Sequence, residues 1–126
     1  MKVYNVPNFI SAQPLNVSFN SSAYQLNQAM GFSIQLVITG TPTGVFKLQC
    51  SDDANSGAQS PLAQNPLSNP VNWTDVANSS FTVTAAGNIV WNVTSAMYNW
   101  IRVAYTDGSA GASTAIVNGT LNHKGI

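Results

Sequence analysis

Apolar and polar residues alternate along several short stretches of the chain, which is the pattern of a β-strand with one buried face. Between residues 32 and 39 the apolar positions are Phe32, Ile34, Leu36 and Ile38. The turn sequence TPTG follows at 41–44, and residues 45–50 then alternate again. Proline presets φ and glycine tolerates a positive φ, so this sequence suits a tight turn. The two stretches are predicted to form a β-hairpin.

Further short strands are predicted along the rest of the chain, with turn-forming residues between them. They lie at 15–20, 23–26, 79–84, 88–94, 99–106 and 113–122. Many short strands with such breaks are typical of all-β domains rather than of alternating β and α units. We therefore predict an all-β fold, a two-sheet antiparallel β-sandwich of the jelly-roll or immunoglobulin-like type, with about eight strands and little or no helix. Residues 95–99 are predicted to form at most one short helical turn or a loop.

No shift in composition divides the chain, so residues 1–126 are predicted to form a single domain. Residues 51–71 contain Pro61, Pro66 and Pro70 and show no alternation, which predicts a long surface loop. Residues 1–13 are rich in apolar side chains and are interrupted by Pro7. They are predicted to form either an arm that adds to a neighbour's sheet edge or an ordinary first strand.

Charged side chains are rare, at 6% of the 126 residues against about 25% in an average soluble domain. Four basic and four acidic residues give a net charge of zero, which argues against a protein that binds nucleic acid phosphates. A hydrophobic content of 44% is enough to build a core, which argues against a disordered chain. The apolar stretches are too short for a membrane-spanning helix, and the first residues lack the apolar run of a secretory signal. We expect synthesis in the cytoplasm, with no nucleic acid and no membrane partner.

Groups capable of acid–base or nucleophilic chemistry are scarce in this chain. His123 is the single histidine, and its place near the C-terminus predicts a solvated side chain on a frayed end. The four aspartates, Asp52, Asp53, Asp75 and Asp107, fall where turns or strand ends are predicted. Capping those turns is their expected role.

The single cysteine, Cys50, excludes an intrachain disulfide and a multi-cysteine metal site, and we expect it to be a small buried hydrophobe. The sequence shows no zinc-ligand spacing, no phosphate-binding glycine loop and no serine–histidine–aspartate set. We therefore predict no catalytic residue, no metal ligand and no cofactor, and hence a protein that is not an enzyme.

The three tryptophans allow two interpretations. They could form an aromatic platform that stacks on sugar rings, or they could pack in the sandwich. Trp91 lies in phase with apolar neighbours and is predicted to be in the core. Trp100 shares a strand face with Arg102, which predicts a partly exposed ring, and Trp73 could cover one end of the sandwich.

Short motifs spread over residues 32–125 carry a resemblance to a known module. They are GVFKLQCSDD at 44–53, NWTDV at 72–76, a strand at 83–91 that ends in tryptophan, YNWIRVAYT at 98–106, and a final strand that runs into Lys-Gly at 124–125. Together they resemble a small β-sandwich module of tailed-bacteriophage virion proteins, of the capsid decoration or stabilising type. Trp73, Tyr98, Trp100, Arg102 and Tyr105 occupy the matching positions, and the resemblance implies that they define the fold.

The resemblance implies a non-enzymatic structural protein located on the virion after synthesis in the bacterial host. The expected partners are the major capsid protein or other virion proteins, and copies of the chain itself in a homo-oligomer. Low charge suits such a role, because the cores of protein interfaces are depleted in charged residues. The candidate partner-binding residues are Tyr4, Phe9, Ile10, Trp73 and Trp100. Two alternatives stay open: a carbohydrate-binding, lectin-like module that stacks a glycan on Trp73 or Trp100, and a structural component of the tail or neck.

Overall fold

The computed structural model describes residues 2–26, 29–53, 70–94, 96 and 98–125. These residues form ten β-strands and no helix, which confirms the predicted all-β fold. The strands are β1 (Lys2–Pro14), β2 (Phe19–Asn20), β3 (Tyr24–Gln25), β4 (Ala29–Thr39), β5 (Gly44–Ser51), β6 (Thr74–Asp75), β7 (Phe81–Val83), β8 (Gly87–Val93), β9 (Trp100–Asp107) and β10 (Ile116–Gly125). In this part of the chain no helix is long and apolar enough to cross a membrane.

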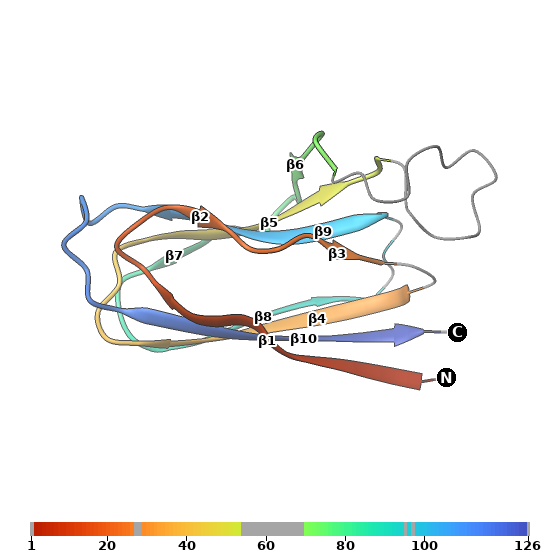
Figure 1. Ribbon diagram of the computed structural model, residues 1–126, viewed down its shortest axis with the longest axis horizontal. Coiled ribbons are helices and arrows are strands. Elements are labelled where there is room, and N and C mark those ends of the chain that lie inside the picture. The colour runs from red at the N-terminus through yellow and green to blue at the C-terminus, as the bar shows by residue number, and fades with distance from the viewer. Residues whose placement is uncertain (1, 27–28, 54–69, 95, 97, 126) are drawn as a thin grey trace.

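The strands form two antiparallel sheets that pack face to face, as Figure 1 shows. One sheet has four strands in the order β1-β10-β4-β8. The other has six strands: β9 and β5 are central, β2 and β3 pair with the outer side of β9, and β6 and β7 pair with the outer side of β5. The two ends of the chain lie side by side at one end of the sandwich, because β1 pairs antiparallel with β10. The predicted antiparallel β-sandwich is thus confirmed.

The core lies between the sheets and is built by the alternation seen in the sequence. On β4 the residues Phe32, Ile34, Leu36 and Ile38 are all buried, as predicted. On β9 the inward residues are Ile101, Val103 and Tyr105, and on β10 they include Val117 and Leu121. A slip of one residue in any of these strands would turn its apolar set outward, so burial fixes the register.

The outer strand beside β5 is broken into β6 and β7, and Ser79 lies buried at the break. Its hydroxyl donates to the carbonyl of Val76 at 2.7 Å and accepts from the backbone N–H of Leu48 at 3.1 Å. Its carbonyl accepts from the indole N–H of Trp91, on the opposite sheet, at 2.8 Å. Ser79 therefore provides a hydrogen-bond acceptor for the N–H of Leu48 where the strand beside β5 is interrupted, and its bond to Trp91 links the two sheets.

The predicted strands at 15–20 and 23–26 are shorter in the structure. Leu15 is fully buried, and its N–H donates to the carbonyl of Ala115 at 3.0 Å, so the chain there crosses between the sheets before it pairs with β9. Most of the loop predicted at 51–71 and part of the turn predicted at 95–99 lie outside the described residues. The two-residue strand β6, Thr74–Asp75, was not predicted from the sequence.

Candidate functional site

Three of the candidate partner-binding residues lie on β1, which pairs with β10 of the same chain. Tyr4 is exposed, and its ring stacks on that of His123 with centroids 4.8 Å apart. Phe9 is half-buried and meets the ring of Tyr24 edge-on, at 6.3 Å. Ile10 is part of the hydrophobic core. Of these three side chains, Tyr4 is therefore the one most open to a partner.

His123 does not lie on a frayed end, and the expectation of a solvated side chain was wrong. β10 continues to Gly125 between β1 and β4, which places the imidazole beside Tyr4 and Tyr24. Its Nδ1 atom is buried and has no hydrogen-bond partner among the described residues. Burial lowers the pKa of His123 below its ordinary value, because desolvation disfavours the imidazolium. The side chains that lie against the imidazole are the rings of these two tyrosines.

The outer face of the four-stranded sheet has a surface without charge over most of its length, which we name the uncharged face. Strand pairing places its residues in cross-strand rows: Asn5, Asn122, Ser33 and Asn92; then Thr120, Gln35 and Val90; then Asn118, Val37 and Asn88. In the first row the Asn5 side-chain amide donates to the Asn122 side-chain oxygen at 2.6 Å. Val37 and Val90 are exposed among these amides. This combination of amides and apolar side chains suits contact with another protein surface.

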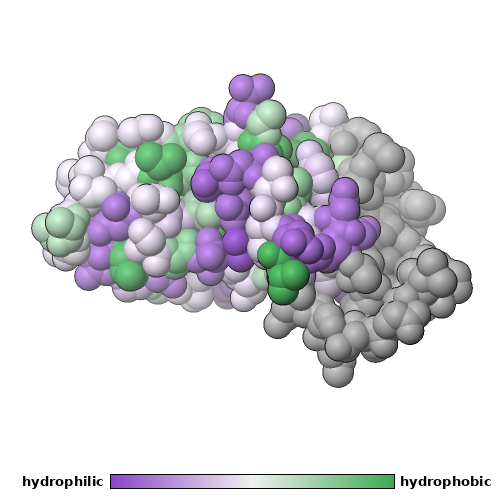
Figure 2. Space-filling model, turned by 90° about the horizontal axis from the view of Figure 1, so that it is seen from above, coloured by the Kyte–Doolittle hydropathy of each residue, from purple (hydrophilic) through white to green (hydrophobic). Residues whose placement is uncertain are grey.

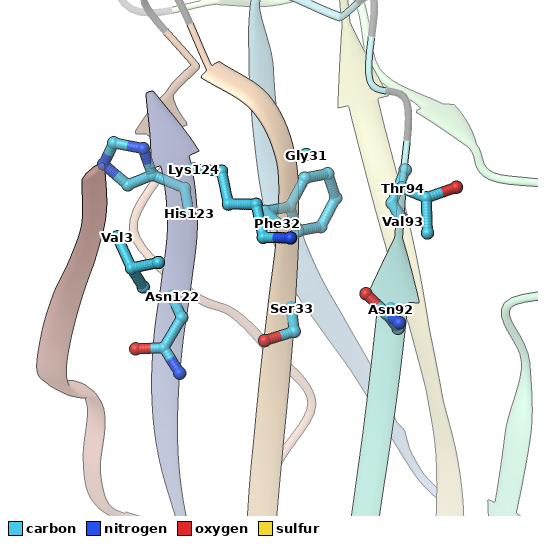
Figure 3. A pocket seen from close by; sticks show the side chains of 10 residues that line it. All are labelled: Val3, Gly31, Phe32, Ser33, Asn92, Val93, Thr94, Asn122, His123 and Lys124. Atoms are coloured by element: carbon cyan, nitrogen blue, oxygen red, sulfur yellow. The ribbon is translucent and has the colours of Figure 1, made fainter. Parts of the chain in front are cut away.

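One end of the uncharged face is hollowed, and Figure 3 shows Asn122, Ser33 and Asn92 side by side at this hollow. Its volume is about 300 Å³. Gly31 contributes to the hollow because it has no side chain, and a Cβ there would lie 2.7 Å from the Val93 carbonyl oxygen. Lys124 is the one charged residue that lines it. Sequence analysis missed this face, because alternation shows which residues point outward but not which strands lie next to each other.

A second surface lies on the other side of the molecule, where Trp73 meets Arg102. The Arg102 guanidinium lies over the Trp73 ring, 4.2 Å from its centroid, in a cation–π contact. The indole N–H of Trp73 donates to the Pro70 carbonyl at 3.2 Å, which fixes the ring. Burial lowers the pKa of Arg102 but leaves the group charged, since arginine does not lose its proton in proteins.

Arg102 belongs to a polar network on the outer face of the six-stranded sheet. Its Nε donates to the Gln49 side-chain oxygen at 2.8 Å, and the Gln49 amide donates to Asp75 at 2.9 Å. Lys47 pairs with Asp75 at 3.0 Å. The pKa of Asp75 is lowered by the bond from Gln49 and by Lys47. Figure 2, which looks onto this face, shows hydrophilic residues gathered across its middle.

A pocket of about 350 Å³ lies beside this network, and we name it the Trp73 pocket. Its lining residues are Ser21, Ser22, Ala23, Pro70, Trp73 and Arg102. Arg102 forms no ion pair within the described part of the chain, where the one ion pair joins Lys47 and Asp75. The pocket therefore offers an aromatic ring, serine hydroxyl groups and an arginine that pairs with no carboxylate in the described structure.

Trp100 lies away from both surfaces, and the expectation that it is partly exposed was wrong. Its side chain is only 8% exposed. It shares a face with Arg102, as predicted, but it lies where β9 is flanked on both sides, by Gln25 of β3 and Ser51 of β5. Its indole N–H is buried without a partner among the described residues. Trp91 is in the core, as predicted.

Asp107 caps a turn, as predicted. Its carboxylate accepts from the Ser109 hydroxyl at 2.6 Å and from the Ser109 backbone N–H at 2.8 Å, and these bonds lower its pKa. Asp53 instead joins segments that are distant in sequence, because it accepts the backbone N–H groups of Asn72 and Val71, at 2.9 and 2.6 Å, which lowers its pKa. The described residues contain no group of three or more metal-ligating side chains. Cys50 is half-buried, and burial, followed by the nearby charge of Asp52, raises the pKa of its thiol.

The sequence matches no known family profile and no curated protein. Its fold is shared by solved structures at low identity. The SPBc2 prophage-derived protein YomS is 12% identical with a TM-score of 0.54, over 97% of this chain and 92% of that one. PirA is 12% identical with a TM-score of 0.50, over 97% and 93%. The coat protein of Tobacco streak virus is 9% identical with a TM-score of 0.46, over 96% and 84%. The first two comparisons establish that this chain has the same β-sandwich fold as those two proteins.

Proposed function

We propose that this protein is a non-enzymatic structural protein of a bacteriophage virion, and that it decorates and stabilises the capsid by binding the shell through its uncharged face. The observation that carries the proposal is the composition of that face. Its three cross-strand rows contain amides, hydroxyls and exposed valines but no charge, and Lys124 lies beyond them at one end of the face. Burying such a surface does not require the desolvation of charged groups, which is costly at interfaces.

Two further observations support this role. The sandwich fold is shared with a prophage-derived protein along nearly the whole length of both chains. The motifs at 44–53, 72–76 and 98–106 that resemble the bacteriophage module fall on the six-stranded sheet and the segment leading into β6. The uncharged face on the other sheet stays available for the shell.

Co-sedimentation with particles tests this proposal. Particles are prepared from a phage genome from which this coding sequence has been deleted, and the purified protein is added back. We expect saturable binding of the wild type and loss of binding for Val37→Lys, because Val37 is 41% exposed within the uncharged face. Thr106→Lys is the matched control, since Thr106 is an exposed strand residue on the other sheet. If the wild-type protein stays in the supernatant, the proposed capsid-binding role is wrong. If Val37→Lys binds as well as the wild type, the uncharged face is not the binding surface.

A second candidate function, the binding of an acidic glycan, is favoured by Arg102. A sugar ring can pack against Trp73 while its carboxylate pairs with the guanidinium, which has no carboxylate partner in the described structure. A pocket of about 350 Å³ is of the size that holds small ligands. We infer that this pocket prefers a glycan containing a uronic acid over a neutral one.

Tryptophan fluorescence tests the glycan site, because Trp91 and Trp100 are buried and Trp73 is the half-buried indole. We expect an oligosaccharide that contains glucuronic acid to change the emission, and a neutral glucan of equal length to have little effect. Arg102→Gln should weaken binding about tenfold or more, because it removes a charge-assisted hydrogen bond. Trp73→Phe should remove the signal. Equal binding of the neutral glucan, or no effect of Arg102→Gln, argues against the acidic preference.

A further inference from the structure

The two edges of the four-stranded sheet are built differently. β1 forms one edge and β8 the other. β1 contains Pro7, has two register shifts against β10, and has left-handed backbone at Asn8 and Ala12, with φ of 60° and 45°. Proline and bulges are the devices by which natural edge strands avoid pairing with other chains. β1 is thus protected as an edge.

β8 has none of these devices. Its pairing with β4 runs without a shift from Gly87, opposite Ile38, to Val93, opposite Phe32. The strand contains no proline and no charged residue. In an antiparallel edge strand alternate residues point their N–H and C=O groups away from the sheet. Within the described structure no second strand pairs with β8, so these groups are open to another chain.

Exposed apolar side chains lie beside this edge. Val90 of β8 is 53% exposed, and Phe81 of β7 is 40% exposed. The Phe81 ring contacts the Trp91 ring from the side, with centroids 5.7 Å apart. A regular, uncharged and partly apolar edge is a surface on which strand addition is favourable.

The charge distribution indicates which chain would pair there. The sequence from residue 76 to residue 101 contains no charged side chain, and β8 lies within it. When two copies pair around a two-fold axis, the same segment faces itself, so any charge at the axis would meet an equal charge. A neutral strand avoids that repulsion, and it offers no charge by which a different partner could be selected.

We propose that β8 pairs antiparallel with β8 of a second copy, around a two-fold axis at Val90, so that two four-stranded sheets become one continuous sheet. The inference rests on the proposed function, because it assumes a structural protein whose copies assemble with one another. In this register Asn88 lies opposite Asn92 of the partner subunit. The pair Asn5 and Asn122, bonded at 2.6 Å, shows that asparagines on neighbouring strands of this same face can bond to each other. The uncharged face would then run across both copies.

Analytical ultracentrifugation over a concentration series tests the pairing. We expect the wild type to be a dimer and Val90→Lys a monomer, because two like charges would then lie directly opposite each other at the axis, on Cβ atoms about 5 Å apart. Val90 is exposed, so the variant should fold, which circular dichroism checks. Val37→Lys is the matched control: it places the same charge on the same face but on β4, and it should remain a dimer.

A charge exchange tests the register itself. The double variant N88K/N92E sets a lysine opposite a glutamate at both ends of the paired strands and should stay dimeric. The double variant N88K/N92K sets lysine opposite lysine and should dissociate. Each of three results would overturn the inference. The first is a wild type that is monomeric at every concentration, the second is a Val90→Lys variant that stays dimeric, and the third is the same oligomeric state for both double variants. Particle binding by a monomeric wild type would overturn this inference alone and leave the proposed function standing.

Discussion

At the scale of single residues, His123 shows how a chain with few ionisable groups still acquires a response to pH. The imidazole lies between the rings of Tyr4, from β1, and Tyr24, from β3, and its buried Nδ1 has no partner among the described residues. Its pKa is lowered by burial, so below the pKa of the unfolded chain the unfolded state binds more protons than the folded state. Lys124, its neighbour in sequence, is exposed and points to the other face of β10.

We therefore expect the free energy of unfolding to be highest above about pH 6.5 and to fall as the pH is lowered through that value. Urea unfolding followed between about pH 8 and pH 5 measures it. His123→Phe should remove this dependence, and Tyr4→Phe should keep it, since it retains the ring that stacks on the imidazole. The aspartates with lowered pKa values change the free energy of unfolding only at more acidic pH, because the ordinary pKa of aspartate is near 3.8. A His123→Phe variant with the wild-type pH profile would contradict this explanation.

At the scale of elements, the break between β6 and β7 is stabilised by one hydroxyl. Ser79 is the buried polar residue that accepts the N–H of Leu48 where no strand residue does so. A buried donor left without a partner costs about 1–3 kcal/mol.

Ser79→Ala should therefore lower the free energy of unfolding by about 1–3 kcal/mol, because the N–H of Leu48 loses its acceptor. Ser80→Ala is the control: Ser80 is exposed beside it, and its replacement should change stability by less than about 0.5 kcal/mol. Denaturant unfolding of the two variants measures both values. Equal stabilities for the two variants would show that the Ser79 hydroxyl does not stabilise the break.

Elements also show how far the sequence predicts the structure. Alternation predicted β4, β5 and β9 with their buried faces, because a half-buried strand needs a period of two. It could not predict that Trp100 is buried on the other face, since that depends on the flanking strands, Gln25 on one side and Ser51 on the other, which are distant in sequence. The same limit applies to the uncharged face, whose rows exist only because β10 lies between β1 and β4.

At the scale of the whole molecule, the two outer faces of the sandwich differ in charge. The ion pair of Lys47 with Asp75 and the cation of Arg102 lie on the six-stranded sheet. The three cross-strand rows of the uncharged face carry no charge, and Lys124 lies at one end of that face. Salt screens contacts between exposed charges and has little effect on contacts between neutral groups.

The two proposed binding activities should therefore respond differently to salt. Raising the ionic strength from about 0.1 M to about 1 M shortens the screening length from about 10 Å to about 3 Å. Binding of the protein to particles should change little over this range, and binding of an acidic glycan should weaken severalfold. Co-sedimentation and fluorescence titration at the two salt concentrations measure the two effects. Particle binding that falls as steeply as glycan binding would show that charges, not the uncharged face, make the contact.

The opposite orientation of the two outer faces makes this molecule directional. A copy lying with its neutral side against a support turns Trp73 and Arg102 toward the surrounding medium, because the two sheets back onto a common core. Many copies laid down in this way would form a coat with a uniform outward chemistry, an arginine over an indole at every site. The four-stranded sheet would then attach each copy to the support, and the six-stranded sheet would face the molecules in the medium.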